Sequence, residues 1–200
     1  MTRGFFIGRF QPFHNGHRTL VAEIVDEVDE LVLGIGSADA SHTTRNPFTA
    51  GERVMMITKA VEEFDIPVYV VPIEDIDRNA VWVSHVRSMT PTFDVAYSNN
   101  PLVVQLFEEA GIEVRQSQLY DRDRLEGTDI RGRMLADESW TDRVPDPVAD
   151  VIDEINGVQR LQTIAKDDVA QRWAADEGDD ADGDANGDDD PESSGDADGE

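Results

Sequence analysis

The chain has 200 residues, and 43 Asp and Glu against 17 Lys and Arg give it a formal net charge of −26 at pH 7. It contains no cysteine, which excludes a disulfide framework, a thiolate nucleophile and a Cys-ligated zinc site. Nucleic acid and membrane are disfavoured as partners, because binding either depends on neutralising phosphate charge with Lys and Arg. The sequence shows neither a signal peptide nor an apolar stretch of about 20 residues, so it predicts a soluble, cytoplasmic protein.

Short apolar runs alternate along the chain with segments of helical period. The predicted strands cover residues 5–8, 31–36, 68–71, 93–97 and 112–115. The predicted helices between them cover about 17–28, 49–61, 80–89 and 102–110. Because the strands are continuous apolar runs separated by helices, they indicate a parallel sheet covered on both faces. The expected fold class is therefore α/β, a doubly wound, Rossmann-like parallel sheet of about five strands.

The last third of the chain changes in composition. Residues 128 to about 173 predict three short helices, the middle one starting near Pro145 and Pro147 and ending before Gly157. Residues 176–200 contain 13 Asp and Glu and no Lys or Arg, so this segment has nothing to bury and is expected to be a disordered acidic tail. The predicted organisation is thus a folded domain over 1–175 with C-terminal helices, followed by the tail.

Half of the net charge remains on the predicted folded domain, whose only lysines are Lys59 and Lys166. An acidic, lysine-poor surface is typical of proteins from halophiles, organisms that keep molar salt in the cytoplasm. A Debye length of about 3 Å near 1 M salt makes such self-repulsion tolerable. The sequence therefore predicts a protein that needs high salt for its stability.

The loop after the first predicted strand lies where a doubly wound sheet binds its ligand, outside the carboxyl ends of the strands. It holds His14 and His17, with Gly16 between them. Glycine allows close approach of a ligand, and a helix beginning near His17 would direct N–H groups and its positive dipole end at an anion. A tight turn with exposed histidines explains the spacing equally well, whereas a metal site lacks a third ligand nearby.

The segment Gly8–His17 resembles the HxGH signature of the nucleotidylyltransferase superfamily, and its particular form resembles the archaeal-type nicotinamide-nucleotide adenylyltransferases. Segments 34–38, 46–53, 77–83 and 127–131 also agree, so that the resemblance spans roughly residues 3–168. It implies transfer of AMP from ATP to nicotinamide mononucleotide, which gives NAD and pyrophosphate and uses Mg²⁺. It also implies a homo-oligomer, of which a hexamer is one form.

Adenylyl transfer gathers several negative charges, so cationic and N–H donors are expected at the site. The resemblance implies catalytic roles for His14, His17, Arg45 and Arg131. It implies ATP binding by Gly8, Arg9, Phe10, His14, His17, Thr128 and Arg131, and binding of nicotinamide mononucleotide by Asn79 and Trp82. No protein side chain is expected as a metal ligand.

Several of these residues have a plainer explanation. Arg131 could be a surface charge, Arg45 a loop arginine and Trp82 a core aromatic. Glu126 also departs from the family, which more often has serine before the Gly-Thr pair, and a carboxylate facing a triphosphate would be repelled. This departure puts phosphate contact at that one position in doubt.

Three other functions remain open on the sequence alone. One is another HxGH adenylyl- or cytidylyltransferase acting on a different phosphate monoester. The others are a non-catalytic nucleotide sensor and an interaction protein that acts through the acidic tail.

Overall fold

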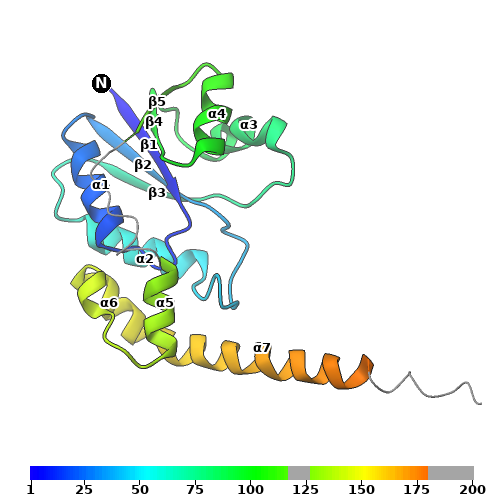
Figure 1. Ribbon diagram of the computed structural model, residues 1–200. Helices are drawn as coiled ribbons and strands as arrows, with labels where there is room; N and C mark the ends of the chain where they lie inside the picture. Colours follow the sequence, from blue (N-terminus) through cyan, green and yellow to red (C-terminus); the bar gives the residue numbers. More distant parts are fainter. Residues whose placement is uncertain (117–126, 180–200) are drawn as a thin grey trace, which may run out of the picture. The chain divides into compact units, whose positions relative to one another are not determined.

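A computed structural model of the chain describes residues 1–116 and 127–179, and side chains up to residue 170. Residues 1–165 form a compact unit, separate from the unit over 166–200. The compact unit is built on a five-stranded parallel sheet with the order β3-β2-β1-β4-β5 (Figure 1). The strands are β1 (Arg3–Gly8), β2 (Glu30–Ile35), β3 (Val68–Pro72), β4 (Val95–Tyr97) and β5 (Glu113–Arg115). The predicted α/β class, the parallel sheet and all five strands are confirmed.

The first four helices follow the predicted alternation, and three more helices and a short 3₁₀ turn come after the sheet. The first group is α1 (Asn15–Val25), α2 (Ala50–Val61), α3 (Asn79–Met89) and α4 (Pro101–Glu109). The second group is α5 (Gly127–Leu135), η1 (Thr141–Arg143), α6 (Asp146–Glu154) and α7 (Gly157–Asp179). Because α7 continues to Asp179, four residues of the predicted acidic tail are helical. The remaining tail residues, 180–200, lie outside the described residues.

The sheet has one hydrophobic cluster on each face, and adjacent residues of β1 serve opposite faces. Phe6 belongs to the larger cluster, which α1, α2, α5 and α6 cover, whereas Phe5 belongs to a smaller cluster with Val86 of α3 and Phe107 of α4 (Figure 1). This division follows from the two-residue period of a strand. The edge strand β3 is less buried than the sequence predicts, and Tyr69 in it is 40% exposed.

Local signals in the sequence explain where two of the helices begin. Thr49 caps α2, and its side chain and that of Glu52 each accept the other's backbone N–H, as in the predicted capping box. Asn100 caps α4 with Pro101 in its first turn. Sheet order reverses between β1 and β4, so the carboxyl end of β1 faces the crevice where such folds bind ligands.

Candidate active site

His14 and His17 form a reciprocal cap at the start of α1. His14 is the N-cap residue, and its Nδ1 accepts the backbone N–H of His17 at 3.3 Å. In return, Nδ1 of His17 accepts the backbone N–H of His14 at 3.2 Å. The two rings stack with their centroids 3.6 Å apart. The helix thus begins at Asn15, two residues before the predicted start, and the His17 N–H is bonded to the His14 ring.

These hydrogen bonds assign the proton on each imidazole. A neutral ring has one donor and one acceptor nitrogen, so rings that accept at Nδ1 carry their proton at Nε2. Burial lowers the pKa of His14 to about 4. Burial, and then the adjacent His14, lower the pKa of His17 well below its usual value. Near pH 7 the pair therefore offers two uncharged Nε2–H donors.

A pocket of about 400 Å³ lies in front of this helix start. It is lined by Arg9, Phe10, Gln11, Pro12, His14, His17, Asn100, Gly127, Thr128 and Arg131. Six of these belong to the loop after β1 or the first turn of α1, and three come from the start of α5. Asn100, the cap residue of α4, lies in the loop after β4, so the pocket lies across the β1–β4 switch point.

Arg131 is buried, at 8% exposure, so it is no free surface charge. Its guanidinium donates to the Gln11 carbonyl at 2.7 Å, the Thr44 carbonyl at 3.1 Å and the Thr128 hydroxyl at 3.2 Å. The side chain thus ties α5 both to the histidine loop and to the loop that carries Arg45. An arginine has five N–H donors, and three of them are used in these contacts.

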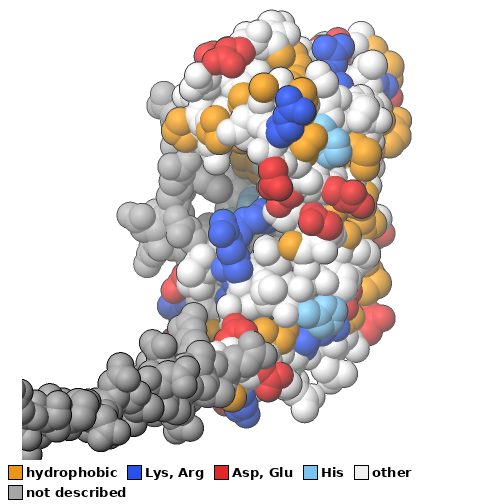
Figure 2. All heavy atoms as spheres, turned by 90° about the vertical axis from the view of Figure 1, so that its right-hand side faces the viewer, with side chains coloured by type: hydrophobic (Ala, Val, Ile, Leu, Met, Phe, Trp, Pro, Cys, Tyr) orange, Lys and Arg blue, Asp and Glu red, His pale blue; other side chains and the backbone are white. Residues whose placement is uncertain are grey.

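The electrostatic surroundings of Arg131 are cationic. Burial, and then the nearby guanidinium groups of Arg9 and Arg45, together lower its pKa to about 10. The pKa of Arg9 is also lowered, first by burial and then by Arg45, with Asp75 opposing. Arg45 itself is exposed. Figure 2 shows Lys and Arg side chains gathered beside a hollow on one face of the molecule. Arg45 is not among the residues that line the pocket, but it lies near enough to Arg9 and Arg131 to lower the pKa of both. Cations that repel one another at a pocket are suited to a multiply charged anion.

Two predicted glycines allow close packing around the pocket. A Cβ on Gly8 would lie 2.8 Å from the Phe10 ring, which folds back over the end of β1. A Cβ on Gly127 would lie 3.0 Å from the Gln11 carbonyl oxygen and 3.1 Å from Nη1 of Arg131. The absence of a side chain at Gly8 therefore leaves room for the Phe10 ring. Its absence at Gly127 lets the start of α5 approach the histidine loop.

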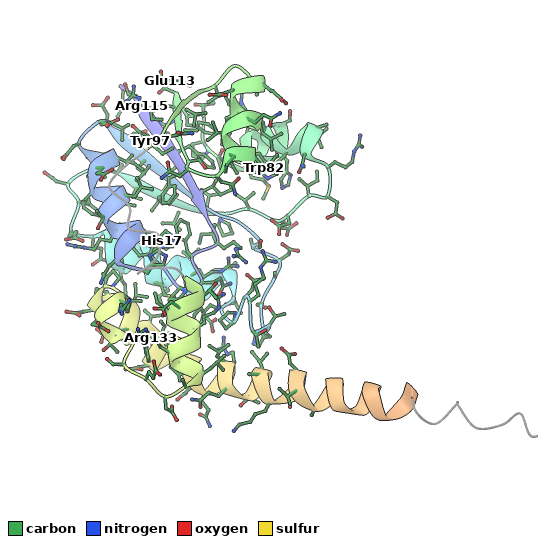
Figure 3. All side chains as sticks on the ribbon, viewed as in Figure 1. His17, Trp82, Tyr97, Glu113, Arg115 and Arg133 are labelled. Atoms are coloured by element: carbon green, nitrogen blue, oxygen red, sulfur yellow. The ribbon has the colours of Figure 1, made fainter. Side chains whose placement is uncertain are left out.

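The structure does not bring Asn79 and Trp82 into the lining of this pocket. Asn79 is exposed in the first turn of α3. Trp82 is half-buried, with its ring edge-on to Phe107 at a centroid distance of 5.3 Å. Figure 3 shows Trp82 on α3 beside α4, and His17 at the start of α1. Glu126, where the sequence departs from the family pattern, lies outside the described residues.

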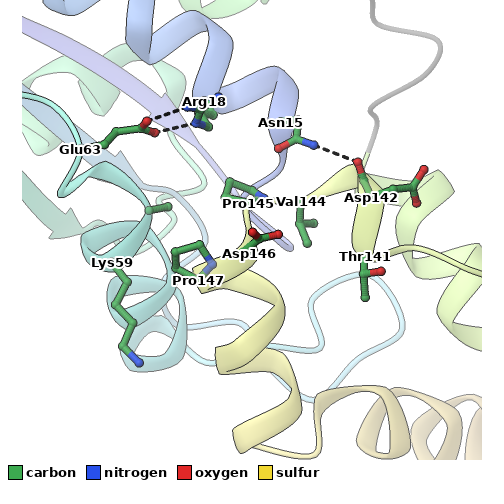
Figure 4. A pocket seen from close by; sticks show the side chains of 11 residues that line it. Asn15, Arg18, Lys59, Glu63, Thr141, Asp142, Val144, Pro145, Asp146 and Pro147 are labelled. Carbon is green, nitrogen blue, oxygen red and sulfur yellow. Dashed lines mark hydrogen bonds and ion pairs between the residues drawn. The ribbon is translucent and has the colours of Figure 1, made fainter.

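A second pocket, of about 460 Å³, lies between α1, α2, η1 and α6 (Figure 4). Its cations are paired with carboxylates: Arg18 makes two contacts of 2.6 Å with Glu63, and Lys59 lies 3.9 Å from Glu154. Asn15 closes one side by donating to the Asp142 carbonyl. Although this pocket is the larger, it has no cluster of uncompensated charge among its lining residues.

Two buried side chains that support the first pocket were not singled out from the sequence. Gln11 joins the histidine loop to residue 48, donating to the Phe48 carbonyl and accepting its N–H. Arg53 is fully buried and donates only to backbone carbonyls. A polar residue on the inner side of an amphipathic helix, as Arg53 is on α2, is the signal that could have revealed it.

A family model and a solved structure identify the class of protein to which the chain is similar. The family model described as cytidylyltransferase-like matches residues 5–133. The bifunctional NMN adenylyltransferase/ADP ribose pyrophosphatase from Francisella tularensis, solved with AMP and a manganese ion, has a similar fold, with a TM-score of 0.68 and 18% identity. The similarity covers 87% of this chain and 55% of that one. Both findings agree with a nucleotidyltransferase fold.

Closer relatives specify the family. The protein named nicotinamide-nucleotide adenylyltransferase from Haloarcula marismortui is 71% identical over 173 residues, which cover 86% of this chain and 92% of its own. The protein of the same name from Methanoculleus marisnigri is 59% identical over 168 residues, covering 84% of this chain and all of its own. The chain therefore belongs to the nicotinamide-nucleotide adenylyltransferase family within the cytidylyltransferase-like proteins. No helix within residues 1–116 and 127–179 is long and apolar enough to span a membrane.

Proposed function

We propose that the protein transfers the adenylyl group of ATP to nicotinamide mononucleotide, forming NAD and pyrophosphate. Family membership supports this reaction. The observation in the structure that carries it is the reciprocal His14–His17 cap, which turns two neutral Nε2–H donors toward a pocket bordered by arginines. Such donors suit charge that develops on phosphate oxygens during transfer.

The reaction needs little covalent chemistry from the protein. An oxygen of the mononucleotide phosphate, already anionic at pH 7, attacks the α-phosphorus of ATP, and the bond to the bridging oxygen of pyrophosphate breaks. No side chain has to remove a proton from the nucleophile, so the main tasks are alignment and charge stabilisation. We assign His14 and His17 to the α-phosphate and the oxygens around it.

We assign the cationic groups to binding the phosphates of ATP and to stabilising the pyrophosphate that leaves. Arg131 and Thr128, at the start of α5, would hold the β- and γ-phosphates with the positive end of the helix dipole. Arg45 would steer the phosphates from the opposite loop and stabilise the departing pyrophosphate. Gly8, Arg9 and Phe10 would contribute mainly backbone groups and the Arg9 charge.

A divalent cation, Mg²⁺ in this proposal, would enter with the triphosphate. No group of three or more His, Asp or Glu side chains suited to a metal is found among residues 1–116 and 127–170. A Mg²⁺ ion that keeps most of its waters and is bound through nucleotide phosphates needs no such group, so the residues present fit it. The ion would neutralise phosphate charge as pyrophosphate leaves.

We further propose that Asn79 and Trp82 bind the mononucleotide. A cationic pyridinium over an indole gains about 0.5 to 2 kcal/mol, and an asparagine can both donate to and accept from a carboxamide. Trp82 is half-buried and uses its edge contact with Phe107, which leaves part of the ring for a ligand. The helix that carries both residues lies on the same side of the sheet as α4. The cap residue of α4, Asn100, lines the pocket in front of His14 and His17, which we call the phosphate pocket in this proposal.

The wider organisation belongs to the same proposal. The domain over 1–175 is expected to carry the activity, so removing residues 176–200 should leave turnover within about twofold if the tail is only a solvated appendage. A homo-oligomer, with a hexamer as one form, is testable by sizing in molar KCl. We place the reaction in the cytoplasm, where ATP is available.

The decisive experiment is a pyrophosphate-release assay in molar KCl with ATP and a panel of phosphate monoesters. We expect turnover with nicotinamide mononucleotide and not with pantetheine phosphate or FMN; CTP with a polyol phosphate should also be inactive. Turnover with another monoester alone would make the protein a different HxGH transferase. ATP binding without any pyrophosphate release would make it a nucleotide sensor.

A further inference from the structure

Arg53 is the largest fully buried side chain among the described residues, and its position relates it to the phosphate pocket. It lies on the inner face of α2 and makes four hydrogen bonds, all to carbonyl oxygens. A buried guanidinium is costly to desolvate unless its donors are satisfied. A leucine or methionine would fill a helix–sheet interface at lower cost, so the cation calls for a further explanation.

The four carbonyls belong to three separate segments that surround the pocket. Nη1 donates at 2.9 Å both to the Arg9 carbonyl, after β1, and to the Gly36 carbonyl, after β2. Nη2 donates at 2.9 Å to the Ser37 carbonyl, and Nε donates at 3.2 Å to the Thr49 carbonyl at the start of α2. One planar guanidinium thus holds the carboxyl ends of β1 and β2 and the end of the Arg45 loop that leads into α2.

The hydrogen bond from Arg53 to the Arg9 carbonyl determines the direction of the next N–H, that of Phe10. In a trans peptide the C=O and the following N–H point in opposite directions. With the Arg9 carbonyl turned inward to Arg53, the N–H of Phe10 points away from the core. The other two peptides held by Arg53 at β2 use their N–H groups internally, because Ser37 donates to Asp75 and Ala38 donates to the Ile73 carbonyl.

Phe10 differs from these two residues in its surroundings. Its φ is +50°, in the left-handed region. Its ring packs under His17 at a centroid distance of 4.8 Å, yet the residue also lines the phosphate pocket. Among the residues described, none accepts a hydrogen bond from the Phe10 N–H. A backbone donor held in place without an internal acceptor is the kind of group that binds phosphate oxygen.

We propose that Arg53 is a positioning residue that, by holding the Arg9 carbonyl inward, aims the Phe10 N–H and the Arg9 guanidinium at the phosphates of the bound nucleotide. The proposal deepens the adenylyl-transfer function and rests on it for the identity of the nucleotide. Arg53 itself touches neither ATP nor the reacting atoms. Its effect passes through the peptide between residues 9 and 10.

The test compares conservative variants of two arginines that hold the start of α2, the buried Arg53 and the partly exposed Arg160. Arg53→Lys keeps the charge and removes the fork, and Arg160→Lys is the matched control. Arg160 also braces the start of α2, through two contacts of 2.8 Å with Glu52, but does not line the phosphate pocket. Binding of ATP and of inorganic pyrophosphate is measured by calorimetry in molar KCl, with the melting temperature of each variant.

We expect Arg53→Lys to weaken both ligands by about 10-fold or more, which corresponds to one or two lost charge-assisted contacts. Its KM for nicotinamide mononucleotide should change much less, and Arg160→Lys should bind ATP like the wild type. A lower melting temperature for Arg53→Lys with unchanged ATP and pyrophosphate affinity would show a purely structural role and overturn the proposal. Binding is measured without turnover, so a wild type that binds ATP but transfers no adenylyl group would refute the proposed function and leave this test intact.

A measurement on the wild type covers the case in which Arg53→Lys does not fold. In ¹⁵N-labelled protein, the Phe10 amide resonance should move downfield when pyrophosphate is added, as expected for an N–H that gains a charged acceptor. The Ser37 and Ala38 amides, held by the same guanidinium but bonded internally, are the controls. A Phe10 resonance that pyrophosphate leaves in place would overturn the proposal.

Discussion

The two pockets of the compact unit are similar in volume but opposite in how their charges are balanced. The pocket between α1 and α6 has Arg18 held by Glu63 and Lys59 near Glu154. The pocket at the end of β1 has arginines whose nearest charged neighbours include other arginines. Although the chain has a net charge of −26, the described arginines of this pocket repel one another, and Asp75 opposes this only in part at Arg9. Charge balance, more than volume, makes the pocket at the end of β1 the better fit for the proposed polyphosphate.

The largest expected effect is on the pH dependence of stability, and it comes from a histidine of the pocket at the end of β1. The pKa of His14 is about 4 in the folded protein and near 6.5 when unfolded, so the unfolded state binds a proton first as the pH falls. The neutral ring thus contributes stability that is complete above pH 6.5 and is lost toward pH 4, by about 3 kcal/mol.

His14→Asn, which keeps a side-chain acceptor for the His17 N–H, should remove that part of the pH dependence. The measurement is the free energy of unfolding of both proteins from pH 7.5 to 4 in molar KCl. Taking the difference between the two proteins cancels the titration of the many carboxylates. Parallel curves would contradict the assignment of a neutral, buried His14.

The next effect is on the rate, and adjacent residues of α1 provide the comparison. His17→Ala should lower kcat by roughly 10²-fold or more and change ATP binding less, because a donor to developing charge acts mainly in the transition state. Arg18→Ala, whose side chain lines the other pocket, should leave kcat within about twofold. The measurement is steady-state kinetics with ATP and nicotinamide mononucleotide. Normal turnover with weaker ATP binding would make His17 a ground-state contact.

A smaller effect concerns the mononucleotide. Trp82→Ala should raise the KM for nicotinamide mononucleotide by roughly 5- to 30-fold, from loss of a cation–π contact of about 1 to 2 kcal/mol, and leave the KM for ATP nearly unchanged. If the indole only fills the cluster around Phe107, the variant should instead lose about 3 to 5 kcal/mol of stability. Melting temperature and KM measured together separate the two roles, and unchanged KM in the folded protein would refute the stacking.

The smallest effect belongs to the paired charges of the second pocket. A double-mutant cycle on Arg18 and Glu63 should give a coupling of about 0.2 to 1 kcal/mol, because both side chains are exposed and their attraction is screened. The coupling should fall further between low salt and molar KCl. A coupling of several kcal/mol in molar KCl would show that this pocket is electrostatically as unusual as the first.

Periodicity and caps allowed most of the fold to be predicted from the sequence. Continuous apolar strands indicated the parallel sheet, and Thr49 and Asn100 marked two helix starts correctly. The end of α7 was placed too early, because acidic composition was taken to end the helix, whereas Ala174 and Ala175 allow helix to continue. The exposure of β3 was missed because an apolar run gives no information on whether its strand lies at an edge.

The candidate site was only partly predictable. The histidine loop was identified from its residue types and the start of α5 from the family resemblance, and the two meet at one pocket. Their mutual hydrogen bonds were not predictable, since they depend on ring orientation. Arg53 gave no motif of its own, because its proposed role follows from four carbonyls in three segments that are separate in sequence and meet only in the folded chain.

The reciprocal histidine cap also explains why the two histidines are three residues apart. An N-cap side chain reaches the N–H of the residue three positions later, and that residue's side chain reaches back, whatever ligand is present. The interval in the motif is therefore one helical turn, set by the backbone before any nucleotide binds. Inserting or deleting one residue between His14 and His17 would separate both rings from their acceptor positions at once. Each ring thus keeps its Nε2–H as a donor at the pocket only as long as its Nδ1 completes the helix cap.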